Sequence, residues 1–226
     1  METSLHRQLK SHYAASDEQT EVQVDSYRID AVDGDELIEI QHASLAALRS
    51  KTAKLLKSHR VRIVKPIIAT KYLVKLDGKG GNIVSRRRSP KRGSLLDLFD
   101  ELIYFREIFP HRRLTIEAVL VDVEERRYPG HGRRRRWRRR DHEVEDQRLL
   151  EVHGKKRLRT ARDLRALLGV RLPKPFHTGH LAKQLGVERW FAQRIAYCLR
   201  HAGTVDEVGK QGNTRLYQFA RRSAAA

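Results

Sequence analysis

The spacing of apolar residues near the start of the chain predicts alternating helices and strands. Apolar positions recur at helical spacing over residues 3–14 and predict a short amphipathic helix. Residues 20–32 alternate between apolar and polar side chains, which is typical of a half-buried strand. The Asp33-Gly34 pair then predicts a tight two-residue turn, so residues 36–41 are expected to form an antiparallel partner strand.

A second helix and a long β-rich stretch follow. Ser44 is suited to cap a helix that ends near His59. Three lysines of this helix are expected to face water: Lys51, Lys54 and Lys57. Residues 61–68 are apolar enough for a buried strand, and the strand–helix–strand spacing predicts a right-handed parallel crossover. Residues 71–77 are expected to continue the sheet at its edge.

The middle of the chain repeats this alternation of helix and strand. Ser94 begins a capped amphipathic helix that runs to about residue 109, and residues 114–128 predict a long strand. Residues 148–160 predict a hairpin centred on Gly154. The Pro173-Lys174-Pro175 stretch then separates about the last 50 residues from the rest.

The C-terminal part has the pattern of a helix-turn-helix followed by a hairpin. Thr178 is suited to cap a short helix, Leu185-Gly186-Val187 makes a turn, and a second helix is expected over 188–201. Two short strands joined through residues 209–213 then form a wing. A compact core is expected from Phe176, Leu181, Leu185, Phe191, Ile195 and Leu199. Residues 160–222 therefore resemble a winged-helix domain.

Charge points to a polyanionic partner. The 226 residues carry 47 Lys and Arg against 28 Asp and Glu, a formal net charge of +19, and basic surface of this kind gathers phosphates by releasing counterions. Residues 1–41 are the exception, with ten acidic side chains against three basic ones. A single cysteine and no apolar stretch near ~20 residues predict a soluble, cytoplasmic protein, with nucleoid association compatible.

Two arginine-rich runs supply much of the positive charge. They span residues 86–92 and 133–140. In the second run Trp137 stands among arginines and offers a stacking surface for a base, so Arg135, Trp137 and Arg138 are predicted to contact nucleic acid. The alternative is that both runs are solvated linkers. DNA is favoured over RNA as the partner, and structured RNA stays open as a third possibility.

Acidic residues of the predicted hairpin form a candidate metal site. With Asp33 and Gly34 at the centre of the turn, Asp30 would face Leu37 and Arg28 would face Glu39. Asp30 and Glu39 would then be diagonal neighbours on one face, able to converge on a hard cation. Gln41 points the same way, so the pattern predicts a Mg²⁺ or Mn²⁺ site with a neutral polar group beside it.

The segment RIDAVDGDELIEIQ resembles the core of PD-(D/E)XK nucleases, and the predicted element order over residues 1–77 is similar. The resemblance implies that Asp30 and Glu39 bind metal, that Gln41 occupies the usual lysine position, and that Glu2 is the acid of the first helix, with Glu21 as a rival. Glutamine cannot stabilise a hydroxide or phosphorane as a cation does. The chain also resembles an uncharacterised bacterial group in which such a core precedes a winged helix.

Two other interpretations of the acidic pair stay open. In one, Asp30 and Glu39 are ordinary solvent-facing acids and Arg28 forms a cross-strand salt bridge with Glu39. In the other, a nuclease fold persists with a degenerate site. The spacing of His177, His180, Cys198 and His201 superficially resembles that of zinc ligands, but Cys198 shares a helical stripe with apolar residues, and a core role is favoured.

These patterns together predict an α/β fold, an αβββαβ restriction-endonuclease-like core, followed by an α+β winged-helix domain. The predicted divisions are a nuclease-like domain over 1–110, a β-rich connector with a basic loop over 111–160, and a nucleic-acid-binding domain over 161–226. Recognition is assigned to Arg189, Trp190, Gln193, Arg194, Lys210 and Arg215. The protein is expected to be a metal-dependent, nuclease-like protein that binds DNA. The alternative is a non-catalytic winged-helix DNA-binding regulator or adaptor on a degenerate nuclease scaffold. A homodimer is compatible with either.

Overall fold

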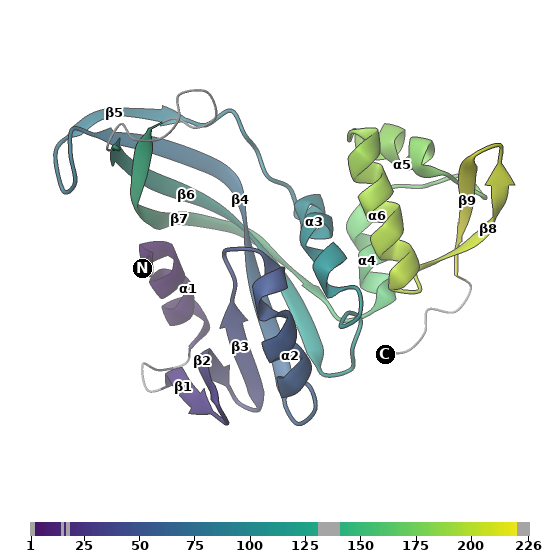
Figure 1. Ribbon diagram of the computed structural model, residues 1–226, viewed down its shortest axis with the longest axis horizontal. Coiled ribbons are helices and arrows are strands. Elements are labelled where there is room, and N and C mark those ends of the chain that lie inside the picture. Colours follow the sequence, from purple (N-terminus) through teal and green to yellow (C-terminus); the bar gives the residue numbers. More distant parts are fainter. Residues whose placement is uncertain (1–2, 15, 17–18, 131–140, 221–226) are drawn as a thin grey trace.

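A computed structural model describes residues 3–14, 16, 19–130 and 141–220. Its main feature is a strongly curved sheet whose two faces carry helices, with a smaller helical unit and hairpin attached beside it (Figure 1). The fold is therefore mixed α/β, as the sequence predicts. None of the helices in these residues is long and apolar enough to cross a membrane.

The large sheet has seven strands in the order β1-β2-β3-β4-β6-β7, with β5 paired to β4. Their bounds are β1 Thr20–Val24, β2 Tyr27–Asp33, β3 Glu36–Ile40, β4 Arg60–Leu76, β5 Ile83–Arg88, β6 Leu114–Pro129 and β7 His142–Leu158. The strand β4 runs parallel to both β3 and β6, and the other neighbours are antiparallel. The predicted parallel crossover between residues 36–41 and 61–68 is confirmed.

Strand β4 is longer and more central than the sequence predicts. Residues 60–64 pair with β3, residues 72–76 pair with β5, and β6 follows β4 along almost its whole length. The prediction that residues 71–77 lie at the edge of the sheet is therefore wrong. Pro66, which has no N–H to donate, falls between the stretches that pair with β3 and β5, where a missing donor costs little.

The predicted hairpin at Gly154 is also wrong. Strand β7 continues through this residue, and β6 pairs with it from Ile116 to Pro129. Leu120 faces Gly154 while Val121 faces Val152, so His153 is an extra residue in a β-bulge. A glycine within a strand pattern marks a bulge as readily as a turn, and here the long partner strand decides between them.

Helices cover the two faces of the sheet with separate cores. Helix α1 (Ser4–Tyr13) buries Leu5 and Leu9 on one face. The other face is covered by a 3₁₀ turn (Leu45–Leu48), α2 (Arg49–Leu55) and α3 (Leu98–Leu102), the last flanked by short 3₁₀ turns (Leu95–Asp97 and Ile103–Phe105). Ser44 and Ser94 cap these segments as predicted, although the expected long helices are broken into shorter pieces.

The C-terminal unit contains three helices and a hairpin. Its elements are α4 (Ala161–Leu168), α5 (Thr178–Leu185), α6 (Arg189–His201), β8 (Val205–Gln211) and β9 (Thr214–Phe219). Helices α5 and α6 and the hairpin lie where the sequence predicts them, whereas α4 was not predicted. His177 rather than Thr178 caps α5, and β8 extends through Gln211.

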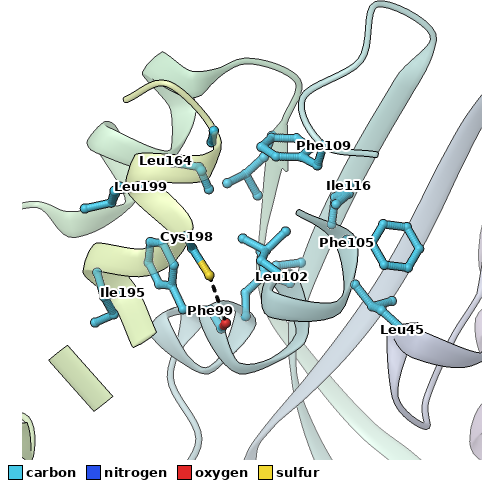
Figure 2. Close-up of a cluster of buried hydrophobic side chains, with 14 of the residues drawn as sticks. Leu45, Phe99, Leu102, Phe105, Phe109, Ile116, Leu164, Ile195, Cys198 and Leu199 are labelled. Atoms are coloured by element: carbon cyan, nitrogen blue, oxygen red, sulfur yellow. Dashed lines mark hydrogen bonds between the residues drawn. The ribbon is translucent and has the colours of Figure 1, made fainter. Parts of the chain in front are cut away.

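Helix α6 joins this unit to the large sheet through one continuous core. Cys198 lies against Phe99 and Leu102 of α3, and Ile116 of β6 belongs to the same buried cluster (Figure 2). The Cys198 thiol donates to the backbone carbonyl of Phe99 at 3.4 Å. The N-terminal and C-terminal elements thus share buried apolar surface, and perturbing that core is expected to affect both.

Phe105→Ala is expected to lower the free energy of unfolding by about 3–5 kcal/mol, because its fully buried ring contacts this shared core. Urea denaturation followed by circular dichroism measures the change. The neighbouring Tyr104→Ala is the matched control, since the Tyr104 side chain is 51% exposed and should change stability little. Equal losses for the two variants would contradict this description of the core.

Candidate active site and nucleic-acid interface

The β2–β3 hairpin brings two carboxylates directly opposite each other. The ladder pairs Ala31 with Ile38 and Asp33 with Glu36, and Gly34 in the turn has φ of +59°. Extended by one residue, this register places Asp30 opposite Glu39. The predicted pairing of Asp30 with Leu37 is wrong, because the turn is centred one residue later than expected. In the observed register the two acids face each other directly and are closer than in the predicted diagonal arrangement. The Cβ atoms of such facing residues are about 4.5–5.5 Å apart.

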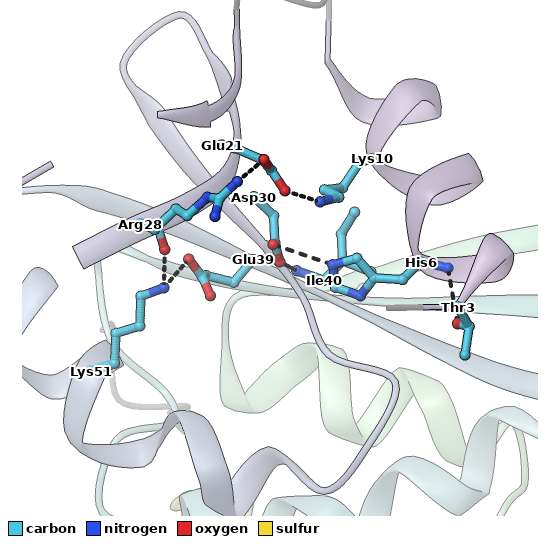
Figure 3. Close-up of polar contacts among 9 residues, drawn as sticks. All are labelled: Thr3, His6, Lys10, Glu21, Arg28, Asp30, Glu39, Ile40 and Lys51. Atoms are coloured by element: carbon cyan, nitrogen blue, oxygen red, sulfur yellow. Dashed lines mark hydrogen bonds and ion pairs between the residues drawn. The ribbon is translucent and has the colours of Figure 1, made fainter. Parts of the chain in front are cut away.

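Asp30 is held from two sides. The imidazole Nε2 of His6, on α1, lies 3.2 Å from one carboxylate oxygen, and the Ile40 backbone N–H donates to the other at 2.8 Å (Figure 3). Burial alone would raise the pKa of the Asp30 carboxyl, but the hydrogen bonds from His6 and Ile40 outweigh it, so the pKa lies below its ordinary value. Asp30 is therefore ionised at neutral pH.

Glu39 is more deeply buried and has a lysine partner. Only 5% of the residue is exposed, and Lys51 Nζ of α2 lies 2.5 Å from its carboxylate while also donating to the Arg28 carbonyl at 2.6 Å (Figure 3). Burial raises the pKa of Glu39, and the nearby charge of Asp30 raises it further, against the opposing effect of Lys51. The prediction that Lys51 faces water is thus wrong.

The remaining acids and the glutamine predicted for this site are placed less centrally. Gln41 donates its side-chain N–H to the Ser44 carbonyl at 2.7 Å. Glu21 forms an ion pair with Lys10 at 2.6 Å and contacts the Arg28 guanidinium. The predicted salt bridge from Arg28 to Glu39 is replaced by this contact and by Lys51. Glu2 lies outside the described residues.

Sequence reasoning missed His6 and Lys51 as members of this cluster. Both stand on helices that are distant in sequence from the hairpin, and no motif marks them. The only signal for Lys51 was chemical: a buried acid at position 39 without lysine at position 41 needs a cation from elsewhere. The helix phase that directs Lys51 to Glu39 is set by how α2 packs on the sheet.

A second group of possible metal ligands lies on the long strands. Within the described residues, Asp122, Glu151 and His153 are the one group of three whose ligand atoms all lie within 4.8 Å of one another. His153 Nε2 is 3.0 Å from the carboxylate of the half-buried Asp122, and Glu151 and His153 are exposed. The bulge at His153 turns this side chain beside Asp122, which the predicted hairpin at Gly154 would not do.

A groove lies between α6 and the C-terminal hairpin. It has a volume of about 280 Å³. Its lining consists of Thr178, Arg189, Gln193, Tyr197, Arg200, Asn213, Thr214, Arg215 and Tyr217. Lys210 faces Arg215 across the hairpin, so both project from the same face of the wing. Of the predicted recognition residues, Arg189, Gln193 and Arg215 therefore share one groove, and Lys210 lies next to it.

Two predicted recognition residues lie on another side of α6. The Arg194 guanidinium pairs with Asp100 of α3 at 2.7 Å and lies 4.8 Å from the centre of the Trp190 ring. Trp190 is 54% exposed. The Arg194 guanidinium thus forms an ion pair between α6 and α3, whereas Arg189 and Gln193 line the groove.

The arginine runs differ in what the structure shows of them. Arg86, Arg87 and Arg88 lie on the exposed strand β5, so this run is a strand rather than the expected loop. Arg86 stacks 4.3 Å from the centre of the Tyr72 ring. The predicted contacts Arg135, Trp137 and Arg138 lie outside the described residues.

The cysteine is a core residue, as predicted. Cys198 is buried, its thiol donates to the Phe99 carbonyl, and burial raises the pKa of that thiol to about 12. His177 and His180 stack on each other with ring centres 3.7 Å apart at the start of α5. The four residues with zinc-like spacing therefore serve packing and helix capping.

Comparisons with known proteins show the family to which this chain belongs. Residues 3–159 match the model of a domain of unknown function, DUF8091, and the chain is a member of that family. An uncharacterized protein of Treponema pallidum (strain Nichols) is 30% identical over 219 residues, which cover 96% of this chain and 85% of the Treponema protein. No solved structure matches the chain.

Asp30→Asn is expected to lower the free energy of unfolding by about 1–2 kcal/mol at pH 7, because the hydrogen bonds from His6 and Ile40 favour the ionised carboxylate. The folded-state pKa is depressed, so this stabilisation is present above the unfolded pKa and is lost as pH falls through the folded value. Urea titrations at pH 7 and pH 3 test it. Asp35→Asn, an exposed change on the same hairpin, is the control; a loss for Asp30→Asn that is the same at both pH values would contradict the assignment.

Proposed function

We propose that this protein is a metal-dependent, nuclease-like phosphodiesterase that binds nucleic acid, with DNA favoured over RNA. The observation that carries the proposal is the direct opposition of a half-buried Asp30 and a buried Glu39 on neighbouring strands. The two facing carboxylates repel each other, and the raised pKa of Glu39 reflects its burial first and the Asp30 charge after it. Such a pair is costly for stability alone and suited to holding a divalent cation.

The order of elements around this pair supports the proposal. Helix α1, the antiparallel strands β1 to β3, helix α2 and the parallel strand β4 follow one another in the αβββαβ order of the PD-(D/E)XK core that residues 1–77 resemble. In that core an acid on the second strand and an acid on the third bind metal. Asp30 on β2 and Glu39 on β3 occupy those two strands.

The residues present fit a magnesium or manganese ion. Asp30 and Glu39 would hold it through hard oxygen ligands, and when bound it would supply Lewis acidity toward a phosphate and acidify a water. His6 fixes the orientation of the Asp30 carboxylate, and Lys51 fixes that of Glu39. The Lys51 ammonium also places beside the site the positive charge that Gln41 does not provide, where it would stabilise negative charge on the phosphate.

The C-terminal unit supports binding to a duplex. Helices α4 to α6 and the β8–β9 hairpin follow one another in the order of a winged helix, and the groove between α6 and the hairpin contains three arginines. The exposed arginines of β5 extend positive charge along the large sheet. Together with the net charge of +19, these features favour DNA as the partner and a cytoplasmic, nucleoid-associated place of action.

A second candidate function is that of a winged-helix regulator or adaptor whose nuclease-like scaffold has a degenerate, non-catalytic site. It is favoured by the way the acidic pair is already compensated: Asp30 by His6, Glu39 by Lys51. Gln41 is meanwhile engaged by the Ser44 carbonyl. In this case the carboxylates serve the packing of α1 and α2 on the hairpin, and binding to DNA is independent of metal.

Cleavage assays separate the two candidates. Labelled single-stranded, duplex and branched DNA is incubated with Mg²⁺ or Mn²⁺, and EDTA is expected to stop cutting. The Asp30→Ala, Glu39→Ala variant is expected to lose about 100-fold or more of the activity, because metal polarisation of the phosphate is worth several kcal/mol, while DNA binding is retained. Asp33→Ala and Asp35→Ala on the same hairpin are matched controls. Binding by wild type and variant without cutting by either would favour the regulator.

The role of Lys51 has a rescue test. Lys51→Ala is expected to lower the cleavage rate by about 10- to 100-fold, since it orients Glu39 and carries the local positive charge. Adding Gln41→Lys to this variant places a cation two residues after Glu39 and is expected to restore part of the rate. Lys54→Ala on the same helix is the control. If the folded double variant recovers none of the cleavage rate, the positive charge of Lys51 is not what contributes to cleavage.

Binding at the groove is expected to depend on Arg189 and Arg215. Each change to alanine should weaken duplex binding and reduce the slope of log K against log salt by about one, because one phosphate contact is lost. Arg194→Ala should have less effect on the slope, since its guanidinium is paired with Asp100. Fluorescence anisotropy across a salt series measures this. Unchanged slopes for Arg189→Ala and Arg215→Ala would place the interface elsewhere.

A further inference from the structure

A cationic cavity lies on the large sheet, apart from the groove of the C-terminal unit. Its volume is about 410 Å³, within the usual range for a small-molecule site. Four basic side chains line it, Lys65, Lys71, Lys91 and Arg127, against two carboxylates, Asp97 and Glu101. His42, two residues beyond the end of β3, is also part of the wall.

The cavity arises from a gap in the pairing of β4. Strand β3 ends at Ile40, and β5 begins to pair with β4 only at Tyr72, so the stretch around residues 65–71 has no strand neighbour on that side. The segment between β5 and α3 closes over the gap. The Gly93 N–H donates to the Ile68 carbonyl at 3.0 Å, and a Cβ at this glycine would lie 2.4 Å from that oxygen. Glycine is therefore required for the segment to lie this close to β4.

The charges around the cavity are only partly compensated. Lys65 is 7% exposed, and its ammonium contacts Glu101 at 3.1 Å and donates to the His42 carbonyl at 3.1 Å. Lys71 and Arg127 share one carboxylate, that of Glu125. Lys91 is exposed at the rim.

The environment of the histidine in the wall, His42, favours its neutral form. Burial lowers the pKa of His42, and the charges of Lys65 and Lys71 lower it further. At neutral pH its imidazole is therefore mostly neutral and can both donate and accept hydrogen bonds. A phosphate would meet lysine ammonium groups and an imidazole in one place.

We propose that this cavity binds the phosphate monoester of a nucleotide, with Lys71, Lys91 and His42 around the phosphate. The apolar wall of Pro66, Ile67 and Leu98 would contact the sugar or base. A monoester carries about −1.5 to −2 charge at neutral pH, more than the single charge of a backbone diester, and so suits a site lined by several cations. This assignment goes beyond the proposed cleavage and does not require the Asp30 and Glu39 site to be active.

The phosphate could belong to the end of a nucleic-acid strand or to a free nucleotide, and a competition experiment distinguishes them. Fluorescent thymidine decamers with a 5′-phosphate, a 3′-phosphate or neither are bound to the full-length protein in EDTA, with adenosine monophosphate and adenosine as competitors. We expect phosphorylated ligands to bind about tenfold more tightly than their unphosphorylated counterparts. A preference confined to the decamers identifies a strand end, and one shared by adenosine monophosphate identifies a free nucleotide.

Matched variants locate the site. Lys91→Glu is expected to abolish the phosphate preference, because it reverses a charge at the cavity rim, and His42→Gln should weaken it. Lys79→Glu, the same charge change at an exposed position in the β4–β5 turn, should leave it intact. No discrimination between phosphorylated and unphosphorylated ligands, or equal loss in Lys79→Glu and Lys91→Glu, would overturn the proposal. Because EDTA is present throughout, the result is independent of whether the protein cleaves DNA.

Discussion

The hydrogen bonding of strand β4 is the constraint on which the rest of the structure depends. One 17-residue strand pairs with β3 near its start, with β5 near its end and with β6 along almost all of its length. The pairing with β3 fixes the acidic hairpin, and the interval before β5 leaves room for the cationic cavity. Because β4 both pairs with the hairpin strand β3 and lines the cavity, strand pairing sets the distance between the two features.

The buried charges of the sheet tie its layers together. Glu117 is fully buried and accepts hydrogen bonds from the Tyr13 hydroxyl of α1 and from Arg157 of β7, both at 2.5 Å. Glu125 of β6 accepts from Lys71 of β4 and from Gln147 of β7 in the same way. Removing one partner from such a buried group leaves an uncompensated charge, which costs far more than the pair contributes. These contacts favour one arrangement of strands and helices over others.

The acidic hairpin departs from this pattern in a way that bears on function. Glu39 has a close cation in Lys51, yet its pKa remains above the ordinary value because burial outweighs the ion pair and Asp30 faces it. Glu117 and Glu125, which are also buried, are different: hydrogen bonds hold the pKa of each below the ordinary value despite burial. A buried acid that is less well compensated than its neighbours supports the proposed metal site, while the existing partners of Asp30 and Glu39 explain how the chain folds without one.

The sequence by itself determined the positions of α1 and β3, the helix caps at Ser44 and Ser94, the core role of Cys198, and α5, α6 and the C-terminal hairpin. Each of these follows from local spacing or from one residue's chemistry. Only the tertiary structure decided the register of the β2–β3 hairpin, the passage of β7 through Gly154, and the meeting of Lys51 with Glu39. A one-residue shift of a turn costs little locally. The choice is made by long-range pairing with β4 and by packing of α1 and α2, which no window of sequence contains.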